Sequence, residues 1–162
     1  MNEPQPLDIY LNDHLGGSVM AIEIAKRCAA ENSGTELGQF LEKFLAEVEE
    51  DKRTLEGLMD AVGASRNPVK QAGAWLGEKL TRLKLGTSEK NLANLLSVET
   101  LCMGVQGKIY LWTALDKVAA DHETLSGMAF NALLKAAQTQ QDGLERHRLE
   151  LAEKALGARP AV

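Results

Sequence analysis

Apolar residues recur along most of this chain at alternating steps of three and four positions, which is the spacing of one face of an α-helix. The first such stripe lies within residues 7–31. It consists of Leu11, Leu15, Ser18, Ile22, Ala25 and Ala29. Asn32-Ser33-Gly34 follows it, and glycine is the usual residue just beyond a helix end. The pattern therefore predicts a helix over 7–31 and a tight turn after it.

The second stripe, within residues 36–63, is the most regular one in the chain. It consists of Leu37, Leu41, Phe44, Val48, Asp51, Leu55, Leu58 and Val62. All of these residues except Asp51 are apolar. Thr35 starts this predicted helix and Gly63 ends it. Because the link at 32–35 is short, we expect the first two helices to be antiparallel neighbours.

The segment after the second helix predicts an unusually long connection. Asn67-Pro68 is a good helix start, and Gly86 is a good end. The apolar residues between them fall on one helical face: Val69, Ala72, Leu76, Leu80 and Leu83. About 16 helical residues at 1.5 Å each span about 24 Å, much of the length of a helical bundle. We predict a crossover helix over 67–85 that carries the chain to the other end of the molecule.

Two further long helices complete the predicted fold. The third opens at Ser88 and carries two stripes: Leu95, Val98, Cys102, Val105, Ile109 and Trp112 form one, and Leu92, Leu96, Glu99, Met103, Gln106 and Tyr110 form the other. A helix with so much apolar surface is expected to sit centrally, with Gly104 and Gly107 allowing close approach of a neighbour. The fourth, over about 121–156, carries Phe130, Leu133, Ala137, Gln140, Leu144, His147 and Leu151.

Length and charge bound what such a protein can do. The 162 residues predict a single all-α domain over 1–162, with a core at 7–156 and frayed ends at 1–6 and 158–162. A net charge of −5 argues against nucleic-acid or membrane-surface binding, and no signal peptide or membrane span is visible. Cys28 and Cys102 lack paired spacing, which is typical of a reducing compartment. We expect a cytoplasmic protein.

Candidate chemistry lies in polar residues that interrupt the apolar stripes, because a buried carboxylate must be paired, protonated or bound to metal. Glu99 stands alone in an apolar run and is as well explained by an ion pair as by a functional role. Asp51 is best explained by pairing with a Lys or Arg across the bundle. Glu23 and Glu47 fit the boundary with water. His147 fits a packed histidine that bonds a carbonyl or Glu150.

Several stretches resemble a known family: Leu11-Asn12-Asp13-His14-Leu15-Gly16-Gly17, Ala74-Trp75-Leu76-Gly77-Glu78-Lys79, Arg82-Leu83-Lys84-Leu85, Glu99, Gly104-Val105-Gln106-Gly107-Lys108 and Leu111-Trp112. Over about residues 7–156 the chain resembles the ferritin-like superfamily, and more narrowly an uncharacterised bacterial ferritin-like family. The resemblance implies a four-helix bundle with a long crossover between helices two and three. It also implies a di-iron centre built from single glutamates on two helices and Glu-x-x-His on the other two.

The chain departs from that ligand pattern, since Leu11, Ala119 and Leu144 stand three residues before the three histidines. A two-metal site needs about six donors, and Arg cannot replace a ligating His. We therefore expect a non-enzymatic protein without a cofactor, a homodimer that acts through protein or small-ligand contacts. The alternative is an iron- or manganese-binding protein with ligands among Glu23, Glu47, Asp51, Glu99 and His147. An adaptor that docks through the basic residues of the crossover is a third, less favoured hypothesis; these residues are Lys70, Lys79, Arg82 and Lys84.

Overall fold

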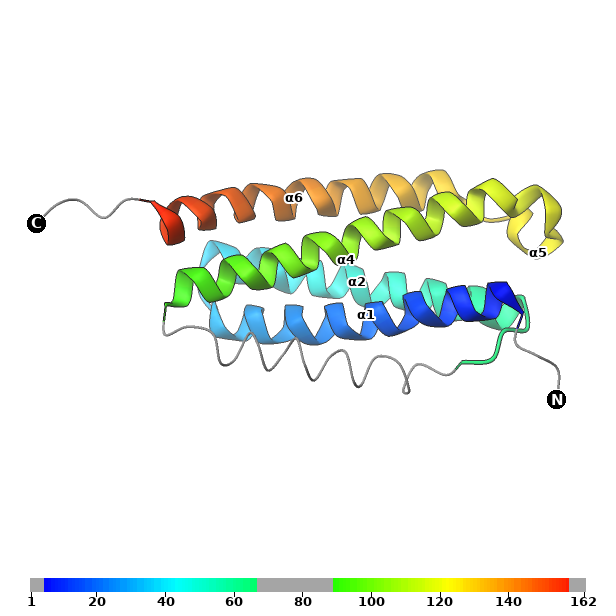
Figure 1. The fold of residues 1–162 in the computed structure, drawn as a ribbon, viewed down its shortest axis with the longest axis horizontal. Coiled ribbons are helices and arrows are strands. Elements are labelled where there is room, and N and C mark those ends of the chain that lie inside the picture. Colours follow the sequence, from blue (N-terminus) through cyan, green and yellow to red (C-terminus); the bar gives the residue numbers. More distant parts are fainter. Residues whose placement is uncertain (1–4, 67–88, 158–162) are drawn as a thin grey trace, which may run out of the picture.

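The computed structural model describes residues 5–66 and 89–157, which form helices and turns without a strand among them (Figure 1). The long helices are α1 (Pro6–Glu31), α2 (Glu36–Ala61), α4 (Lys90–Val118) and α6 (Phe130–Leu156); η1 (Ala119–Asp121) and α5 (Glu123–Ser126) connect the last two. The predicted all-α class is confirmed. The predicted crossover helix at 67–85, with the basic residues of the adaptor hypothesis, lies outside the described residues, as do 1–4 and 158–162.

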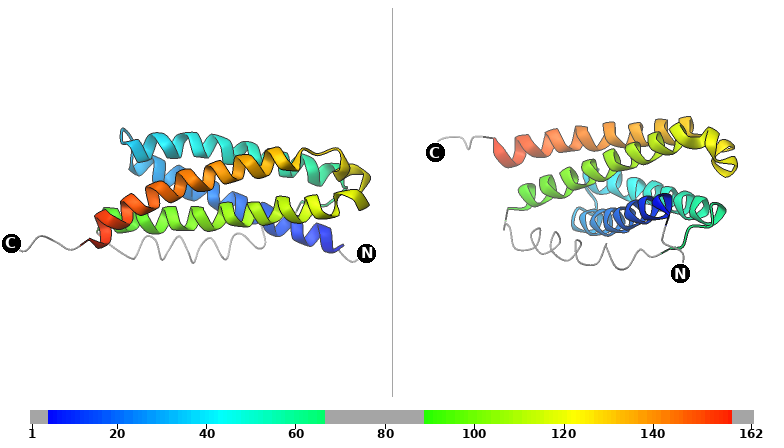
Figure 2. Two further views of the ribbon diagram at one scale, coloured as in Figure 1. Left: turned by 90° about the horizontal axis from the view of Figure 1, so that it is seen from above. Right: turned by 45° about the vertical axis from the view of Figure 1, so that its right-hand side comes forward.

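The long helices are arranged as two antiparallel pairs. α1 packs against α2, α4 packs against α6, and α4 also contacts α1 (Figures 1 and 2). α2 and α4 run in the same direction, so the chain leaves α2 at one end of the molecule and enters α4 at the other (Figure 1). This change of end is the one that the sequence predicts for the segment after the second helix.

The boundaries of α1 and α2 follow the predicted signals closely. The Thr35 hydroxyl caps α2 by accepting a hydrogen bond of 3.1 Å from the backbone N–H of Gly38. Gly34 has φ +78° and Gly63 has φ +72°, a backbone conformation that is unfavourable for residues other than glycine. Pro6 already belongs to α1, so the predicted fraying of residues 1–6 is wrong at its last position, because proline is well tolerated in the first helical turn.

The last two helices begin later than the sequence pattern predicts. α4 starts at Lys90, with Glu89 rather than Ser88 as its N-cap. The fourth long helix starts at Phe130 instead of near 121, because the chain breaks after α5 at Gly127. Leu125 and Phe130 flank this break, are 0% and 2% exposed, and pack into one cluster. Burial of both side chains outweighs the helix propensity of the segment that joins them.

The buried apolar side chains form two clusters rather than one continuous core. The first contains residues mainly from the C-terminal half of α1 and the N-terminal halves of α2 and α4, such as Ile24, Phe44 and Val98. The second lies toward the other end and includes Leu15, Trp112 and Leu125. Both clusters take residues from α1, α2, α4 and α6. Small and polar residues occupy the level between them, which we call the waist.

A pair of buried asparagine amides joins the C-terminal end of α1 to the first turns of α4. Asn32 donates to Asn94 at 3.0 Å and accepts from it at 2.8 Å, and the two residues are 3% and 4% exposed. Asn32 also donates to the carbonyl of Cys28 at 2.7 Å. Because an amide moved by one helical step would lose its partner in an apolar surrounding, the pair fixes the register of α1 against α4.

Asn94→Ala is expected to lower the free energy of unfolding by about 1–3 kcal/mol, because the Asn32 amide is left buried without its main partner. Urea denaturation followed by circular dichroism measures this. The matched control is Asn91→Ala, an exposed asparagine of the same helix, which should change stability by less than about 0.5 kcal/mol. Equal effects of the two substitutions would contradict the role assigned to the pair.

Candidate functional site

A buried polar triad ties three helices together at the waist. Lys108 of α4 donates to the Oδ2 atom of Asp51 on α2 at 2.5 Å and to the Oε1 atom of Gln140 on α6. Gln140 in turn donates to Asp51 Oδ2 at 3.2 Å. The Lys108 and Asp51 side chains are 13% and 17% exposed, and Gln140 is 5% exposed. The cross-bundle ion pair expected for Asp51 is thereby confirmed, and so is the inward position of Gln140.

Opposing effects act on the Lys108 ammonium. Burial lowers its pKa, and this is the largest effect; attraction to Asp51 and more distant Glu47 works in the other direction. The net effect is a pKa below the ordinary value. Removing one member of a buried ion pair leaves the other charge without compensation, so the members of the triad depend on one another.

Beside the triad lies a cavity of about 580 Å³ between α1, α2 and α4. Its lining reaches side chains of both core clusters (Met20, Phe44, Val48, Leu55, Leu111 and Trp112), each of which is 6% exposed or less. Residues that are more exposed, such as Gly17, Ala21 and Met103, complete the lining. Asp51 and Lys108 form part of the same wall. The volume falls within the range of about 300–1,000 Å³ that is typical of small-molecule sites. The waist thus combines a partly open, largely apolar cavity with a small number of fixed polar groups.

Glycines keep this cavity open. Gly17 of α1 and Gly107 of α4 line it, and a Cβ built on either would meet no atom of the described residues within 4 Å. At Gly104 the nearest such atom is the Ala21 Cβ at 3.9 Å, an ordinary contact. The expected close approach of a neighbouring helix is therefore wrong at Gly107, whereas at Gly104 α1 comes within ordinary contact distance of a Cβ. At Gly17 and Gly107 the missing side chain leaves space.

The remaining polar groups of the cavity wall differ in how they are satisfied. The hydroxyls of Ser18 and Thr100 donate to carbonyls of their own helices, at 2.7 and 2.8 Å. His14 packs edge-on against Tyr10, and burial lowers its pKa despite the nearby Asp13. Trp112 is 1% exposed, and its indole N–H finds no acceptor among the described residues. A buried donor without a partner is uncommon in native proteins.

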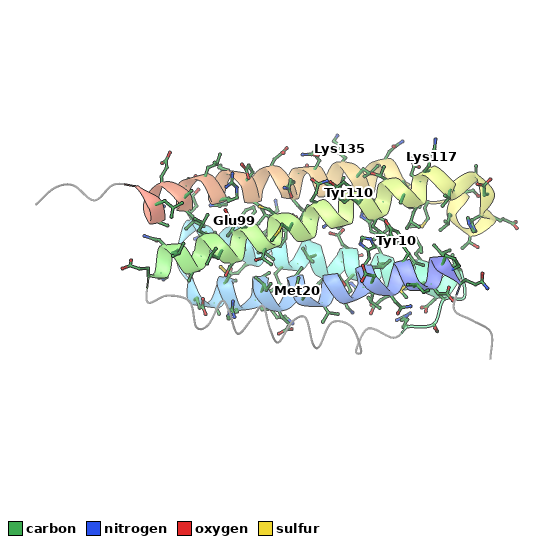
Figure 3. All side chains as sticks on the ribbon, in the orientation of Figure 1. Tyr10, Met20, Glu99, Tyr110, Lys117 and Lys135 are labelled. Carbon is green, nitrogen blue, oxygen red and sulfur yellow. The ribbon has the colours of Figure 1, made fainter. Side chains whose placement is uncertain are left out.

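Glu99, the strongest sequence candidate, lies at the surface. Its side chain is 41% exposed and stands 3.6 Å from Arg148 of α6. The second stripe of α4 is exposed with it: Leu96, Met103 and Tyr110 are 38%, 58% and 63% exposed (Figure 3 labels Glu99 and Tyr110). The expected burial of this stripe is wrong, because α1 and α6 cover the other side of the helix. No helix of the described residues is long and apolar enough to span a membrane.

The other predicted metal ligands also lie apart. Glu23 is exposed and 3.8 Å from Lys26, whereas Glu47 is half-buried and 3.7 Å from Lys43. Across residues 5–66 and 89–157, no three His, Cys, Asp or Glu side chains gather in a group that could hold a metal ion. The predicted ligands do not converge, and the side chains present there do not fit a di-iron centre.

His147 is buried in a different part of the molecule from the cavity. It is 2% exposed and its ring lies 4.5 Å from that of Phe40, which also packs against the backbone of Gly143. Its Nδ1 atom stands 3.8 Å from Glu150. The predicted packed histidine is thus present. Burial and the neighbouring Arg146 lower its pKa, more than Glu150 raises it.

The sequence stripes do not predict the cavity, although the sequence contains a signal for it. Paired glycines, Gly16–Gly17 and Gly104–Gly107, occur in the middle of two predicted helices, where each glycine costs helix propensity. The polar interruptions Asp51 and Gln140 occur midway along the other two helices. Only the alignment of the helices in space shows that these features stand at one level.

Lys108→Met is expected to destabilise the protein by on the order of 3 kcal/mol, because the Asp51 carboxylate stays buried without its cation. Replacement of the whole triad (Asp51→Leu, Lys108→Met and Gln140→Leu) should be less destabilising than the single change. Urea denaturation at pH 7.5 gives both values. Lys117→Met, at an exposed site of the same helix, is the matched control and should be nearly neutral. A triple variant less stable than Lys108→Met would contradict this account.

Acid is expected to destabilise the protein through His147. Its pKa in the folded state is lowered from 6.5, so below about pH 6.5 the unfolded chain takes up a proton that the folded chain refuses. Stability from this residue is complete above that pH and is lost as the pH falls toward the lowered value. His147→Gln should lose less stability than the parent between pH 7.5 and 5 in thermal melts. His122→Gln, at an exposed position, should behave as the parent does.

Comparisons with protein-family models, with curated proteins and with solved structures find no match for this chain. The resemblance to ferritin-like proteins therefore stays a prediction, as does the homodimer. The waist, where the polar triad and the cavity meet, is the feature of the described residues that bears most directly on function.

Proposed function

We propose that this protein is a non-enzymatic helical protein that binds a small, mainly apolar molecule in the cavity between α1, α2 and α4. The observation that carries the proposal is the cavity itself, at about 580 Å³ and with a wall drawn from both core clusters. The cavity is partly open in the described residues, and its volume and largely apolar lining are typical of a site that binds a small molecule.

The residues around the cavity support a binding site more than a packing fault. Gly17 and Gly107 are helical positions where alanine would be better by roughly 1 kcal/mol each and where a Cβ would fit. The Lys108–Asp51 pair places two charges in the same wall at a desolvation cost. The glycines and the ion pair each lower the stability of the fold, and they lie around the same cavity. Such local losses of stability are common where function constrains the sequence.

We also propose that the fold is a ferritin-like four-helix bundle. The order of the long helices and the parallel course of α2 and α4 support this proposal (Figure 2). In such bundles ligand and metal sites lie between facing helices at the core. Since the predicted metal ligands do not converge in the described residues, we propose that the corresponding space serves an organic molecule.

The test is to fill the cavity. Gly107→Leu should project a side chain into the empty space, lower the affinity for the uncharged dye N-phenyl-1-naphthylamine by on the order of tenfold, and leave the protein at least as stable. Dye fluorescence titration measures the affinity, and a thermal melt measures the stability.

Gly57→Leu is the matched control, because Gly57 is an exposed helical glycine of α2 that does not line the cavity. It gains the same helix propensity and should bind the dye as the parent does. The proposal fails if the parent does not bind the dye, or if both substitutions reduce binding equally.

A further inference from the structure

Several polar side chains of the cavity lining are able to accept a further hydrogen bond. The Ser18 and Thr100 hydroxyls each donate their one hydrogen to a backbone carbonyl, at 2.7 and 2.8 Å, so toward the cavity they act as acceptors. Asp51 accepts two hydrogen bonds on its Oδ2 atom, and its Oδ1 atom accepts none from the described residues. Burial lowers the pKa of His14, so its ring is neutral at pH 7.5 and one ring nitrogen is an acceptor.

The charges of the lining are paired, with the exception of Asp13. Lys108 lies 2.5 Å from Asp51, which lines the cavity with it. Lys52, also in the lining, lies 2.6 Å from Glu56. Asp13 stands at an exposed position of α1, and none of the described residues forms an ion pair with its carboxylate. Because a carboxylate neutralises each lysine, the charge that the lining offers to a ligand is the negative charge of Asp13.

Open space lies one helical turn from Asp13. Gly17 follows Asp13 by four positions, which places the two residues on the same face of α1. A Cβ at Gly17 would meet no atom of the described residues within 4 Å. Deeper in the cavity the lining includes Met20 and Phe44, which are 6% and 2% exposed. A charged group beside Asp13 can therefore keep part of its hydration while an attached hydrocarbon chain contacts apolar side chains.

We infer that the ligand is an apolar amine, a protonated amino group on a hydrocarbon body. Its ammonium group lies against the Asp13 carboxylate at the open side of the cavity, and its hydrocarbon body contacts the apolar lining. An ammonium carries three N–H donors and no acceptor, which suits a lining with several acceptors. A carboxylate ligand would instead be repelled by Asp13 and would compete with Asp51 or Glu56 for a lysine. This inference rests on the proposed function, because it names the class of molecule that the cavity binds.

The experiment compares three eight-carbon molecules as competitors of N-phenyl-1-naphthylamine at pH 7.5: octylammonium, octan-1-ol and octanoate. They share a chain and differ in the charge of the head group. Octylammonium should displace the dye at roughly threefold lower concentration than octan-1-ol and roughly tenfold lower concentration than octanoate, the modest effect of an exposed ion pair. About 0.5 M sodium chloride should reduce both differences, because salt screens an exposed charge.

Asp13→Asn keeps the size of the side chain and removes its charge. This variant should lose the preference for octylammonium over octan-1-ol, while its affinity for the uncharged dye stays the same. Asp116→Asn is the matched control, because Asp116 is an exposed aspartate of α4 that does not line the cavity. It changes the net charge by the same amount and should keep the preference of the parent.

The outcomes separate the ligand class from the cavity site. Octan-1-ol or octanoate displacing the dye as well as octylammonium would overturn the ligand class and leave the proposed cavity site standing. Equal losses of the preference in Asp13→Asn and Asp116→Asn would point to net charge alone and overturn the role of Asp13. A parent protein that binds no dye would remove the proposed function and this inference together.

Discussion

An ammonium group can be buried in the middle of this molecule only because a carboxylate and an amide from two other helices meet it there. Lys108 stands on α4, Asp51 on α2 and Gln140 on α6, and each is within hydrogen-bond distance of the other two. A shift of one helix along its axis would leave a charge in an apolar surrounding, which is costly. The triad thereby sets the relative height of three helices, and the division of the core into two apolar clusters follows from it.

The asparagine pair likewise fixes the relative position of two helices, at one end of the molecule. Apolar stripes tolerate sliding and rotation, because one Leu can replace another at small cost, whereas Asn32 and Asn94 satisfy each other only in one register. The two polar clamps hold different helices: the pair holds α1 to α4, and the triad holds α2, α4 and α6. Together, the asparagine pair and the triad fix every long helix by at least one directional contact. Apolar packing therefore supplies most of the stability, and the polar contacts determine the register of the helices.

Several residues at the waist are less stabilising than the residues that selection for folding alone would favour. Three features occur around one cavity: helical glycines beside space that the described residues leave open, a largely buried ion pair, and a buried indole N–H without an acceptor in the described part of the chain. Substitutions that commonly stabilise proteins exist for such features, for example glycine to alanine, or a buried ion pair to apolar residues. The concentration of these features at one level, flanked on both sides by well-packed clusters, is what connects the energetics of the fold to the proposed function.

The sequence by itself determined the all-α class, the first two helices and the turn between them, because periodicity, a Thr cap and glycines at positive φ are local signals. It also placed Gln140 and His147 inward, since both fall on an apolar stripe. It failed where a contact between distant segments decides the outcome. The α6 start depends on burial of Leu125 and Phe130, the exposure of Glu99 depends on which side of α4 its neighbours cover, and the space at Gly107 depends on how far α1 lies from α4. Helical periodicity reports that a face is apolar, but only the packing of one helix on another decides what covers that face and where space remains.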